Sequence, residues 1–539
     1  MSTTSTKTRA EIVSLSELTD EDQAIEAVAS GNGKSKDSNF SKRKYSSVRG
    51  NKGSPATVRP YKKKVNTEQS NRDKLQNRTG KRSPPFIKVS ENKKKYVDCP
   101  ALAKYFRQTQ HMISVRDNGR SGVQRFVYEN GCYRPYADDM IRGMIKQCIK
   151  KHDESLIRTR DINEVFQLLI TDLDHISNDE LNADENLINF SNGLLKIDSL
   201  TLKPHDPEVL STIQLPCKWK GVETPTPVFD DFLDRLTNKK DGVKELLLEF
   251  MGVALSNVKG HRMKKALFLA GPGDSGKSQL KSLTERLLGK GNYAAIDLRE
   301  IEARFGTSNL YGKRLVGSSD MSSFTIDELK TFKKCTGGDS LFAEFKGKDG
   351  FEFVFNGLLW FCMNKPPKFG GDDGDWVYNR IMLVPCTNVI PPDEQDKRLL
   401  DKLYKERAGI IYRAVMALKR VIDNGYRFKE PETVINAREM YKVANNSALA
   451  FFEKCMIERT EKKITDNVTT GVVYKIYKLW CRDNCNGRSK TQSEFRAAIA
   501  NHLGCKYSSL IVRRGKGGSF YKDYALSDEV ISDYQNNLG

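Results

Sequence analysis

The stretch at residues 264–288 constrains the fold more than any other part of this chain. Residues 264–270, KKALFLA, form a short apolar run typical of a buried strand, and they lead directly into GPGDSGKS at residues 271–278. The residues that follow carry leucines at helical spacing up to Gly289. Strand, glycine-rich loop and helix in this order are the context that a phosphate-binding loop requires. We therefore predict an α/β fold built around a P-loop.

Each residue type in this loop suits the binding of a nucleoside triphosphate. Glycines let backbone amides converge on phosphates, and the start of the helix adds the positive end of its dipole. We expect Lys277 to reach the terminal phosphates of ATP and the Ser278 hydroxyl to bind Mg²⁺. The alternative is a chance glycine-rich turn, which the complete motif in its correct context makes improbable. The predicted nucleotide-binding residues are Gly271, Pro272, Gly273, Asp274, Ser275, Gly276, Lys277, Ser278 and Gln279.

Three polar residues beside later strands complete a predicted hydrolytic site. Asp320 ends the run RLVGSSD, where a carboxylate can hold Mg²⁺ through water and polarise an attacking water. Asn364 follows GLLWFCM and can orient that water, and Arg380 precedes another strand and can act as an arginine finger. The alternative for each is structural: a helix cap or turn for Asp320, a turn for Asn364, and no special role for Arg380.

The charge distribution predicts nucleic acid as a partner. The net charge of the 539 residues is +20, and residues 31–95 hold 20 Lys/Arg against four Asp/Glu among few apolar residues. Such a segment cannot bury enough surface to offset its ordering entropy, so we predict that residues 1–95 form a disordered basic arm. It would bind nucleic acid without sequence preference, or serve only as a solubilising linker. Within it, residues 1–30 are mildly acidic and could form one short helix at 20–29.

The 11 cysteines do not form a disulfide framework, because their number is odd and their spacing is irregular. A reducing compartment fits best, and we expect a cytoplasmic location, in a bacterial host. The set Cys481, Cys485, His502 and Cys505 has ligands that zinc would accept, but plain thiols are the favoured interpretation. The longest apolar stretches are too short to span a membrane.

The four elements from Gly271 to Arg380 lie within 110 residues, and this compactness resembles the superfamily 3 helicases, the virus-type AAA+ motors. Between Asp320 and Asn364 lies FKKCTGGD at residues 332–339, which is similar to an additional motif of phage and plasmid primase-helicases. The stretch 186–207 is similar to the domain that precedes the motor in poxvirus-type primase-helicases. The resemblance covers residues 96–530, and it extends to the self-loading replication initiator helicases of phage satellites such as staphylococcal pathogenicity islands.

This resemblance implies a homohexameric ring with ATP between subunits, Arg380 acting in trans, and 3′-to-5′ movement along one strand in the pore. It also implies a pore loop after the Gly-Gly-Asp motif, for which Lys346 and Lys348 are the predicted DNA contacts; a solvated turn is the alternative. Two positions depart from the family pattern. Met321 stands where a second acid is frequent, so the catalytic base is undetermined, and Asn379 stands where many relatives have arginine.

The C-terminal part resembles a winged-helix domain. Helical stripes at 470–484 and 491–503 precede a basic hairpin, whose predicted DNA contacts are Arg513, Arg514 and Lys516. Such a domain places a helix in the major groove of duplex DNA and a wing on its backbone. A winged helix that docks a protein is the alternative.

Together these patterns predict an arm (1–95), an α+β domain (96–225), a helical oligomerisation segment (226–262), a superfamily 3 AAA+ domain (263–440) and a winged-helix domain (441–539). The predicted function is an ATP-dependent replicative helicase that binds, melts and unwinds origin DNA. The alternative is an origin-binding initiator whose ATPase controls assembly only. A packaging motor is disfavoured because no clustered carboxylates follow residue 390, and primase activity at Asp172, Asp174 and His175 is disfavoured because the preceding domain is short.

Overall fold

A computed structural model describes residues 84–115, 123–322, 324–326, 328–347, 349–369, 375–458, 468–485, 489–514 and 517–535. The predicted arm up to residue 83, with its acidic helix at 20–29, lies outside these residues, as do Lys348 and Lys516. Regular structure begins earlier than predicted, because strands β1 (Ile87–Val89) and β2 (Lys95–Val97) pair into an antiparallel hairpin. Phe86 is fully buried beside this hairpin, although lysines lie on both sides of it in the sequence.

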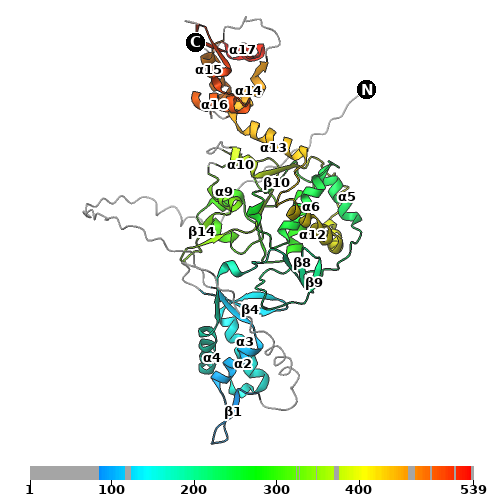
Figure 1. Ribbon diagram of the computed structural model, residues 1–539, viewed down its shortest axis with the longest axis vertical. Coiled ribbons are helices and arrows are strands. Elements are labelled where there is room, and N and C mark those ends of the chain that lie inside the picture. The colour runs from blue at the N-terminus through cyan, green and yellow to red at the C-terminus, as the bar shows by residue number, and fades with distance from the viewer. Residues whose placement is uncertain are drawn as a thin grey trace, which may run out of the picture. The chain divides into compact units, whose positions relative to one another are not determined.

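A five-stranded sheet forms the centre of the chain (Figure 1). All of its neighbouring strands are parallel. Their order across the sheet is β11 (Tyr293–Ala294), β12 (Leu315–Val316), β16 (Leu358–Met363), β10 (Ala266–Ala270) and β18 (Ile381–Pro385). The predicted loop 271–276 leaves the carboxyl end of β10, a central strand. In such sheets, ligands bind outside the carboxyl ends of the strands.

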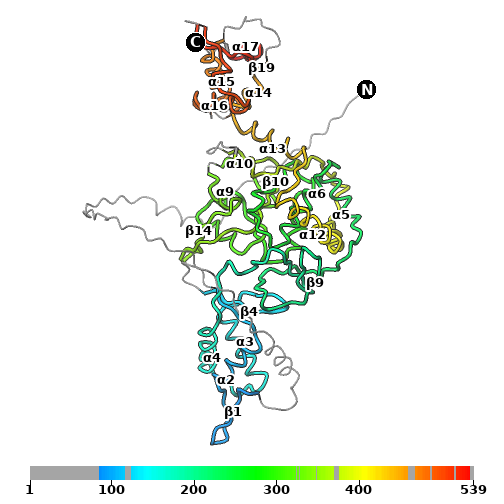
Figure 2. Tube along the Cα trace, in the orientation of Figure 1, coloured from blue at the N-terminus to red at the C-terminus, as the bar shows by residue number. Residues whose placement is uncertain are grey.

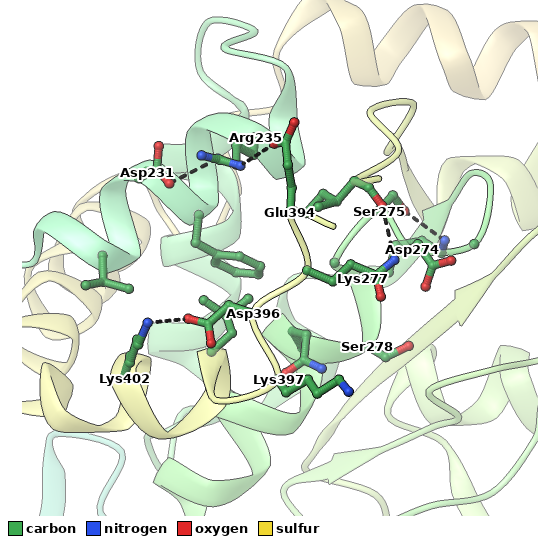
Figure 3. A pocket seen from close by; sticks show the side chains of 18 of the residues that line it. Asp231, Arg235, Asp274, Ser275, Lys277, Ser278, Glu394, Asp396, Lys397 and Lys402 are labelled. Carbon is green, nitrogen blue, oxygen red and sulfur yellow. Dashed lines mark hydrogen bonds and ion pairs between the residues drawn. The ribbon is translucent and has the colours of Figure 1, made fainter. Parts of the chain in front are cut away.

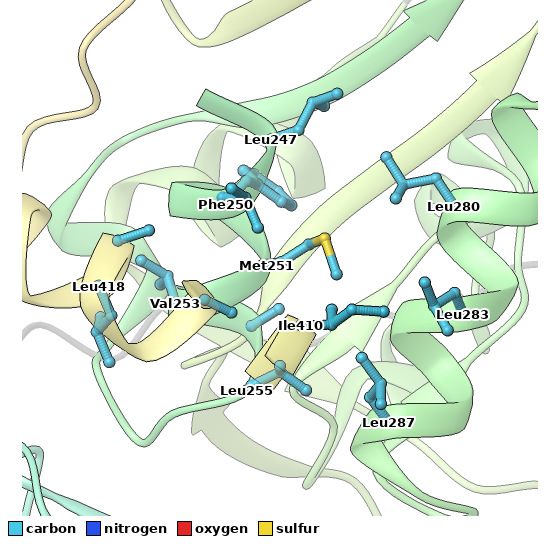
Figure 4. Packing of buried hydrophobic residues seen from close by; sticks show 14 of the residues in the cluster. Leu247, Phe250, Met251, Val253, Leu255, Leu280, Leu283, Leu287, Ile410 and Leu418 are labelled. Atoms are coloured by element: carbon cyan, nitrogen blue, oxygen red, sulfur yellow. The ribbon is translucent and has the colours of Figure 1, made fainter. Parts of the chain in front are cut away.

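Both faces of this sheet are buried, which explains why its strands are continuous apolar runs. Leu267 and Leu269 of β10 belong to one hydrophobic cluster, whereas Phe268 belongs to the cluster on the other face. Figure 4 shows the first cluster, in which leucines of α7 meet side chains of α6 and α12. The helices of this face are α5 (Pro227–Thr237), α6 (Val243–Ala254), α7 (Lys277–Leu288), α11 (Leu399–Lys405) and α12 (Arg407–Asp423).

The opposite face is covered by shorter elements. They bury Phe332, Leu341 and Phe351 against the sheet. These elements are α8 (Leu298–Glu302), α9 (Lys330–Gly337), α10 (Asp375–Asn379), the antiparallel hairpin β14 (Ser340–Ala343) and β15 (Phe351–Val354), and the pair β13 (Thr325–Ile326) and β17 (Lys368–Phe369).

The sequence predicts a helical run at 396–425 and an oligomerisation segment at 226–262, and the core bears on both expectations. The run 396–425 is broken between α11 and α12 at Glu406, whose carboxylate accepts hydrogen bonds from the Val228 and Phe229 amides (3.0 and 2.9 Å) and so caps α5. The apolar side chains that suggested an oligomerisation segment at 226–262 pack inside this chain's own core. They therefore do not support an oligomerisation role.

Arg314 links two parts of the core through buried hydrogen bonds. Its guanidinium donates to the carbonyl oxygens of Val253 (2.9 Å) and Val258 (2.8 Å) at the end of α6, and to that of Asn356 before β16. A cation at the carboxyl end of a helix also complements the helix dipole. The side chain thus joins α6 to the sheet.

The part before the central sheet combines helices and strands, as predicted. The sequence predicts a helical run at 162–176, and this prediction is wrong at its end, because α4 stops at Thr171 and Asp174–Ile176 form strand β6, parallel to β3. The sequence predicts two strands joined by a turn at 186–206, whereas this segment makes three strands. The elements are α2 (Cys99–Thr109), α3 (Asp138–His152), α4 (Thr159–Thr171), the sheet of β3 (Met112–Val115), β4 (Gln124–Glu129), β5 (Cys132–Tyr136) and β6, and the sheet of β7 (Leu187–Phe190), β8 (Gly193–Lys196) and β9 (Thr201–Lys203).

The C-terminal part has a hydrophobic cluster of its own, which includes Phe451, Tyr477 and Phe495. Its helices follow one another along the trace in Figure 2. They are α13 (Glu432–Asn445), α14 (Ser447–Cys455), α15 (Thr470–Asn484), α16 (Gln492–His502) and α17 (Asp528–Gln535), with antiparallel pairs β19 (Met456–Glu458) with β22 (Tyr524–Leu526) and β20 (Ile511–Arg513) with β21 (Ser519–Tyr521). No helix within the described part of the chain is long and apolar enough to cross a bilayer.

Candidate nucleotide site

A cavity of about 840 Å³ opens at the carboxyl ends of β10 and β16 (Figure 3). One wall is the loop at 273–279, and Ser319, Asp320 and Asn364 lie beside it. The facing wall comes from α5 and from residues 390–402. The structure therefore brings the predicted loop, the predicted acid and the predicted amide to one cavity.

The loop holds the ammonium of Lys277 with its own oxygen atoms. Lys277 Nζ donates to Gly271 O (2.9 Å), Pro272 O (2.6 Å) and Ser275 Oγ (3.0 Å), and the side chain is largely buried. Gly276 precedes α7 with φ of 89°, and a Cβ there would meet the Phe232 ring at 3.0 Å. This combination of positive φ and close packing favours glycine at that position.

Ser278 and Asp320 are suited to a magnesium ion. Ser278 Oγ donates to Ser319 O (2.7 Å), so the hydroxyl lies next to the residue that precedes Asp320. The Asp320 side chain is exposed and lines the cavity, and it has no ion-pair partner among the residues that the structure describes. One carboxylate and one hydroxyl suit Mg²⁺, which keeps several waters and binds phosphate oxygens in addition.

Position 321, where the family pattern often has a second acid, is buried in the core. It forms a bridge with Met363 at the sheet, and only 1% of its surface is exposed. Its side chain belongs to the hydrophobic cluster on the face opposite α7. A carboxylate there would be buried among apolar groups, whereas Asp320 and Asn364 line the cavity beside the loop and suit water activation.

Arg380 lies at the amino end of β18, whereas the cavity opens at the carboxyl ends of the strands. Its Nη1 donates to Thr336 Oγ1 (2.8 Å) and Lys333 O (3.3 Å), and its guanidinium lies 5.7 Å from the centre of the Trp376 ring. Burial lowers its pKa below the ordinary value, and Asp339 opposes that change. We call these five residues the Arg380 cluster.

The Arg380 cluster contains Lys333, Thr336 and Asp339 of the stretch FKKCTGGD at residues 332–339. Gly338 ends α9 with φ of 82°, and a Cβ there would approach the His261 ring to 2.8 Å. The motif thus places Asp339 beside Arg380 rather than at the cavity. Arg380 does not line the cavity of its own chain.

The predicted DNA contacts lie on exposed turns. Lys346 follows β14 and is exposed, next to Gly347 with φ of 75°. Arg513 and Arg514 are exposed at the β20–β21 hairpin, and the Arg514 guanidinium lies 5.4 Å from the centre of the Phe520 ring. The other two predicted contacts, Lys348 and Lys516, are outside the described residues.

The two alternative metal sites have no support in the structure. Among the described residues, no group of three or more His, Cys, Asp or Glu side chains could hold a metal ion. His502 instead contacts Glu453 Oε1 (2.9 Å). Asp172 pairs with Arg107, and His175 Nδ1 contacts Ser114 Oγ (2.6 Å).

One wall of the cavity was not predicted from the sequence. Arg235 of α5, Glu394 and Lys397 line this wall, and Phe232 of α5 lines the cavity beside Gly276. A signal was present, because β18 is the parallel neighbour of β10 and the segment after β18 must emerge beside the loop. The charged sequence DEQDK at 393–397 is that segment.

Three family models match the chain. "D5 N terminal like" matches residues 90–238, a family of unknown function (DUF5906) matches residues 269–380, and "Poxvirus D5 protein-like" matches residues 444–536. The helicase-named protein 184R of Invertebrate iridescent virus 6 is 23% identical over 393 residues. That match covers 63% of this chain but only 38% of the relative, so the chain spans well under half of that protein.

Solved structures of the C-terminal region of NrS-1 without ligand are also similar. One is 12% identical with a TM-score of 0.42 and covers 77% of this chain and 97% of that chain. A second is 13% identical with a TM-score of 0.41 and covers 79% and 97%.

The fold and the cavity define an α/β protein whose polar site opens at the carboxyl edge of a parallel sheet. The two D5 family models match the residues before and after this core in the sequence. The D5 family models and the helicase-named relative support a D5-type superfamily 3 helicase of the phage and poxvirus kind. The likeness to initiators of phage satellites is not tested by these matches and stays a prediction.

Proposed function

We propose that this chain is an ATP-dependent DNA helicase of replication that acts as a hexamer. The observation that supports the proposal most directly is the single cavity that unites Lys277, Ser278, Asp320 and Asn364. In this proposal residues 263–440 form the motor, and residues 441–539 bind duplex origin DNA as a winged helix. Lys346, Lys348, Arg513, Arg514 and Lys516 contact DNA.

The residues of the cavity have distinct roles in this proposal. Lys277 exchanges its loop oxygens for the terminal phosphates, and Ser278 and Asp320 hold Mg²⁺, which neutralises charge on the phosphates when bound. Asp320 and Asn364 orient the attacking water. Phe232 of α5 lines the cavity where it packs against Gly276 of the loop, and such an apolar wall suits a nucleobase.

Arg380 acts on the nucleotide of a neighbouring subunit in this proposal. It precedes the amino end of β18, whereas its own cavity lies at the carboxyl end of that strand. The strand between them spans roughly 16 Å at about 3.3 Å per residue. An arginine side chain cannot bridge that distance. A neighbour's cavity brought against the Arg380 cluster would receive the guanidinium, as in a ring with nucleotide between subunits.

Unwinding of a forked duplex by the full chain tests the proposal. We expect wild type to unwind with ATP and Mg²⁺, and Lys277→Ala to lose ATP hydrolysis by on the order of 100-fold or more, together with unwinding. Lys290→Ala is the matched control, because Lys290 is an exposed lysine just after the same helix. Equal unwinding by wild type and Lys277→Ala would refute the motor, whereas ATP hydrolysis without any unwinding would favour an initiator whose ATPase controls assembly.

A further inference from the structure

A second lysine, Lys397, lines the cavity on the wall that faces the loop. It belongs to the segment between β18 and α11, and this segment is fixed at both ends. The Ile390 amide donates to Asp274 O (3.0 Å) at one end. At the other end, the Asp396 carboxylate accepts from the Arg398 amide (2.9 Å) and pairs with Lys402 (2.6 Å). The backbone on both sides of Lys397 is therefore held in place.

Lys397 differs from the other cations that line the cavity. Lys277 is held by loop oxygens, Arg235 pairs with Asp231 (3.0 Å) and Glu394 (3.4 Å), and Lys402 pairs with Asp396. Lys397 is exposed and has no hydrogen-bond or ion-pair partner among the residues that the structure describes. In Figure 3 its side chain extends toward the side of the cavity on which Ser278 lies.

We propose that Lys397 contacts the terminal phosphate of a nucleoside triphosphate bound in its own subunit, and so makes the site prefer triphosphates to diphosphates. This inference rests on the proposed nucleotide site. A triphosphate enclosed by the loop exposes its last phosphate toward the rest of the cavity. An ammonium with three donors on a flexible stem suits such a contact, and a charge-assisted hydrogen bond is stronger than a neutral one.

Lys397 and Arg380 have separable roles, because they approach a nucleotide from different chains. Lys397 lines its own cavity, so its contribution is present in a single subunit. Arg380 lies at the far edge of the sheet and contributes only to a neighbour in the assembled protein. Binding of nucleotide at a protein concentration too low for assembly therefore reports on Lys397 alone.

The test measures the affinity of the full chain for ADP and for a non-hydrolysable ATP analogue, by titration calorimetry or fluorescence. We expect Lys397→Ala to weaken binding of the triphosphate about tenfold, which corresponds to one charge-assisted hydrogen bond, and to leave ADP binding unchanged. Lys397→Arg should retain most of the preference. Arg398→Ala is the matched control, because Arg398 is the next residue and does not line the cavity.

Equal affinities of Lys397→Ala and wild type for both nucleotides would overturn the assignment. An equal loss for ADP and the ATP analogue would also overturn it, because that pattern indicates a structural role. A wild-type chain that binds neither nucleotide would refute the proposed nucleotide site itself, and the role of Lys397 with it.

Discussion

The cavity and the Arg380 cluster lie at opposite strand ends of the same sheet. Polar side chains are exposed in the cavity but have partners within the chain in the cluster. Asp320, Asn364 and Lys397 are exposed in the cavity, whereas Arg380 is engaged by Thr336, Lys333 and Trp376 of its own chain. Open polar groups are available to a ligand that enters from solvent. An arginine already positioned by its neighbours presents a fixed cation, which suits a contact made only when subunits assemble.

Replacing Arg380 should separate the two regions most clearly. We expect Arg380→Ala to lower ATP hydrolysis of the assembled protein about 1,000-fold, because an arginine finger stabilises charge in the transition state. Affinity for nucleotide at low protein concentration should stay at the wild-type value. Parallel measurement of hydrolysis rate and nucleotide affinity checks this, and a loss of affinity in the single subunit would place Arg380 in its own cavity instead.

The second prediction concerns Met321, which lies next to Asp320 in the chain but is buried. Met321→Glu should reduce the free energy of unfolding by about 3 kcal/mol or more, because it buries an unpaired carboxylate. It should not accelerate hydrolysis, although it restores the second acid that many relatives have. Met321→Leu is the control and should cost less than about 1.5 kcal/mol. Faster hydrolysis by a stably folded Met321→Glu variant would contradict our placement of this residue.

Asp320→Asn tests whether the exposed carboxylate of Asp320 acts in hydrolysis without contributing to stability. The carboxylate is exposed and has no ion pair within the described residues, so we expect the melting temperature to be unchanged. The rate of Mg²⁺-dependent ATP hydrolysis should fall about 100-fold, since the amide neither holds the metal ion nor polarises water well. Thermal melting and hydrolysis assays across Mg²⁺ concentrations measure both effects. Wild-type hydrolysis by Asp320→Asn would remove this residue from the site.

The smallest effect is expected at Gly338, which precedes Asp339 of the Arg380 cluster. Gly338→Ala should destabilise the fold by about 2 kcal/mol, because its φ is positive and the added Cβ would press on the His261 ring. Gly425→Ala is a matched control, with φ of 66° and open space around the added Cβ, and should cost about 1 kcal/mol. Denaturant titration measures the difference, and equal costs would show that His261 gives way.

The sequence predicted the elements whose signals are local. The strand, loop and helix around Lys277 follow one another in the chain, and Asp320 and Asn364 each follow an apolar run, so their approach to the loop could be expected from a parallel sheet. Lys397 lies 120 residues after Lys277 in a loop without a motif, and only the pairing of β18 with β10 brings it there. The contacts of Arg380 could not be predicted from the sequence either, because they depend on how α9 packs.

The hydrogen bonds of Lys277 with Gly271, Pro272 and Ser275 satisfy its ammonium within the loop itself. A buried ammonium without such partners would cost free energy, so these oxygen atoms stabilise the loop. In the proposed cycle, the same oxygen atoms are in place to accept the lysine again after the product leaves. Under that proposal, the loop holds its own lysine between one turnover and the next.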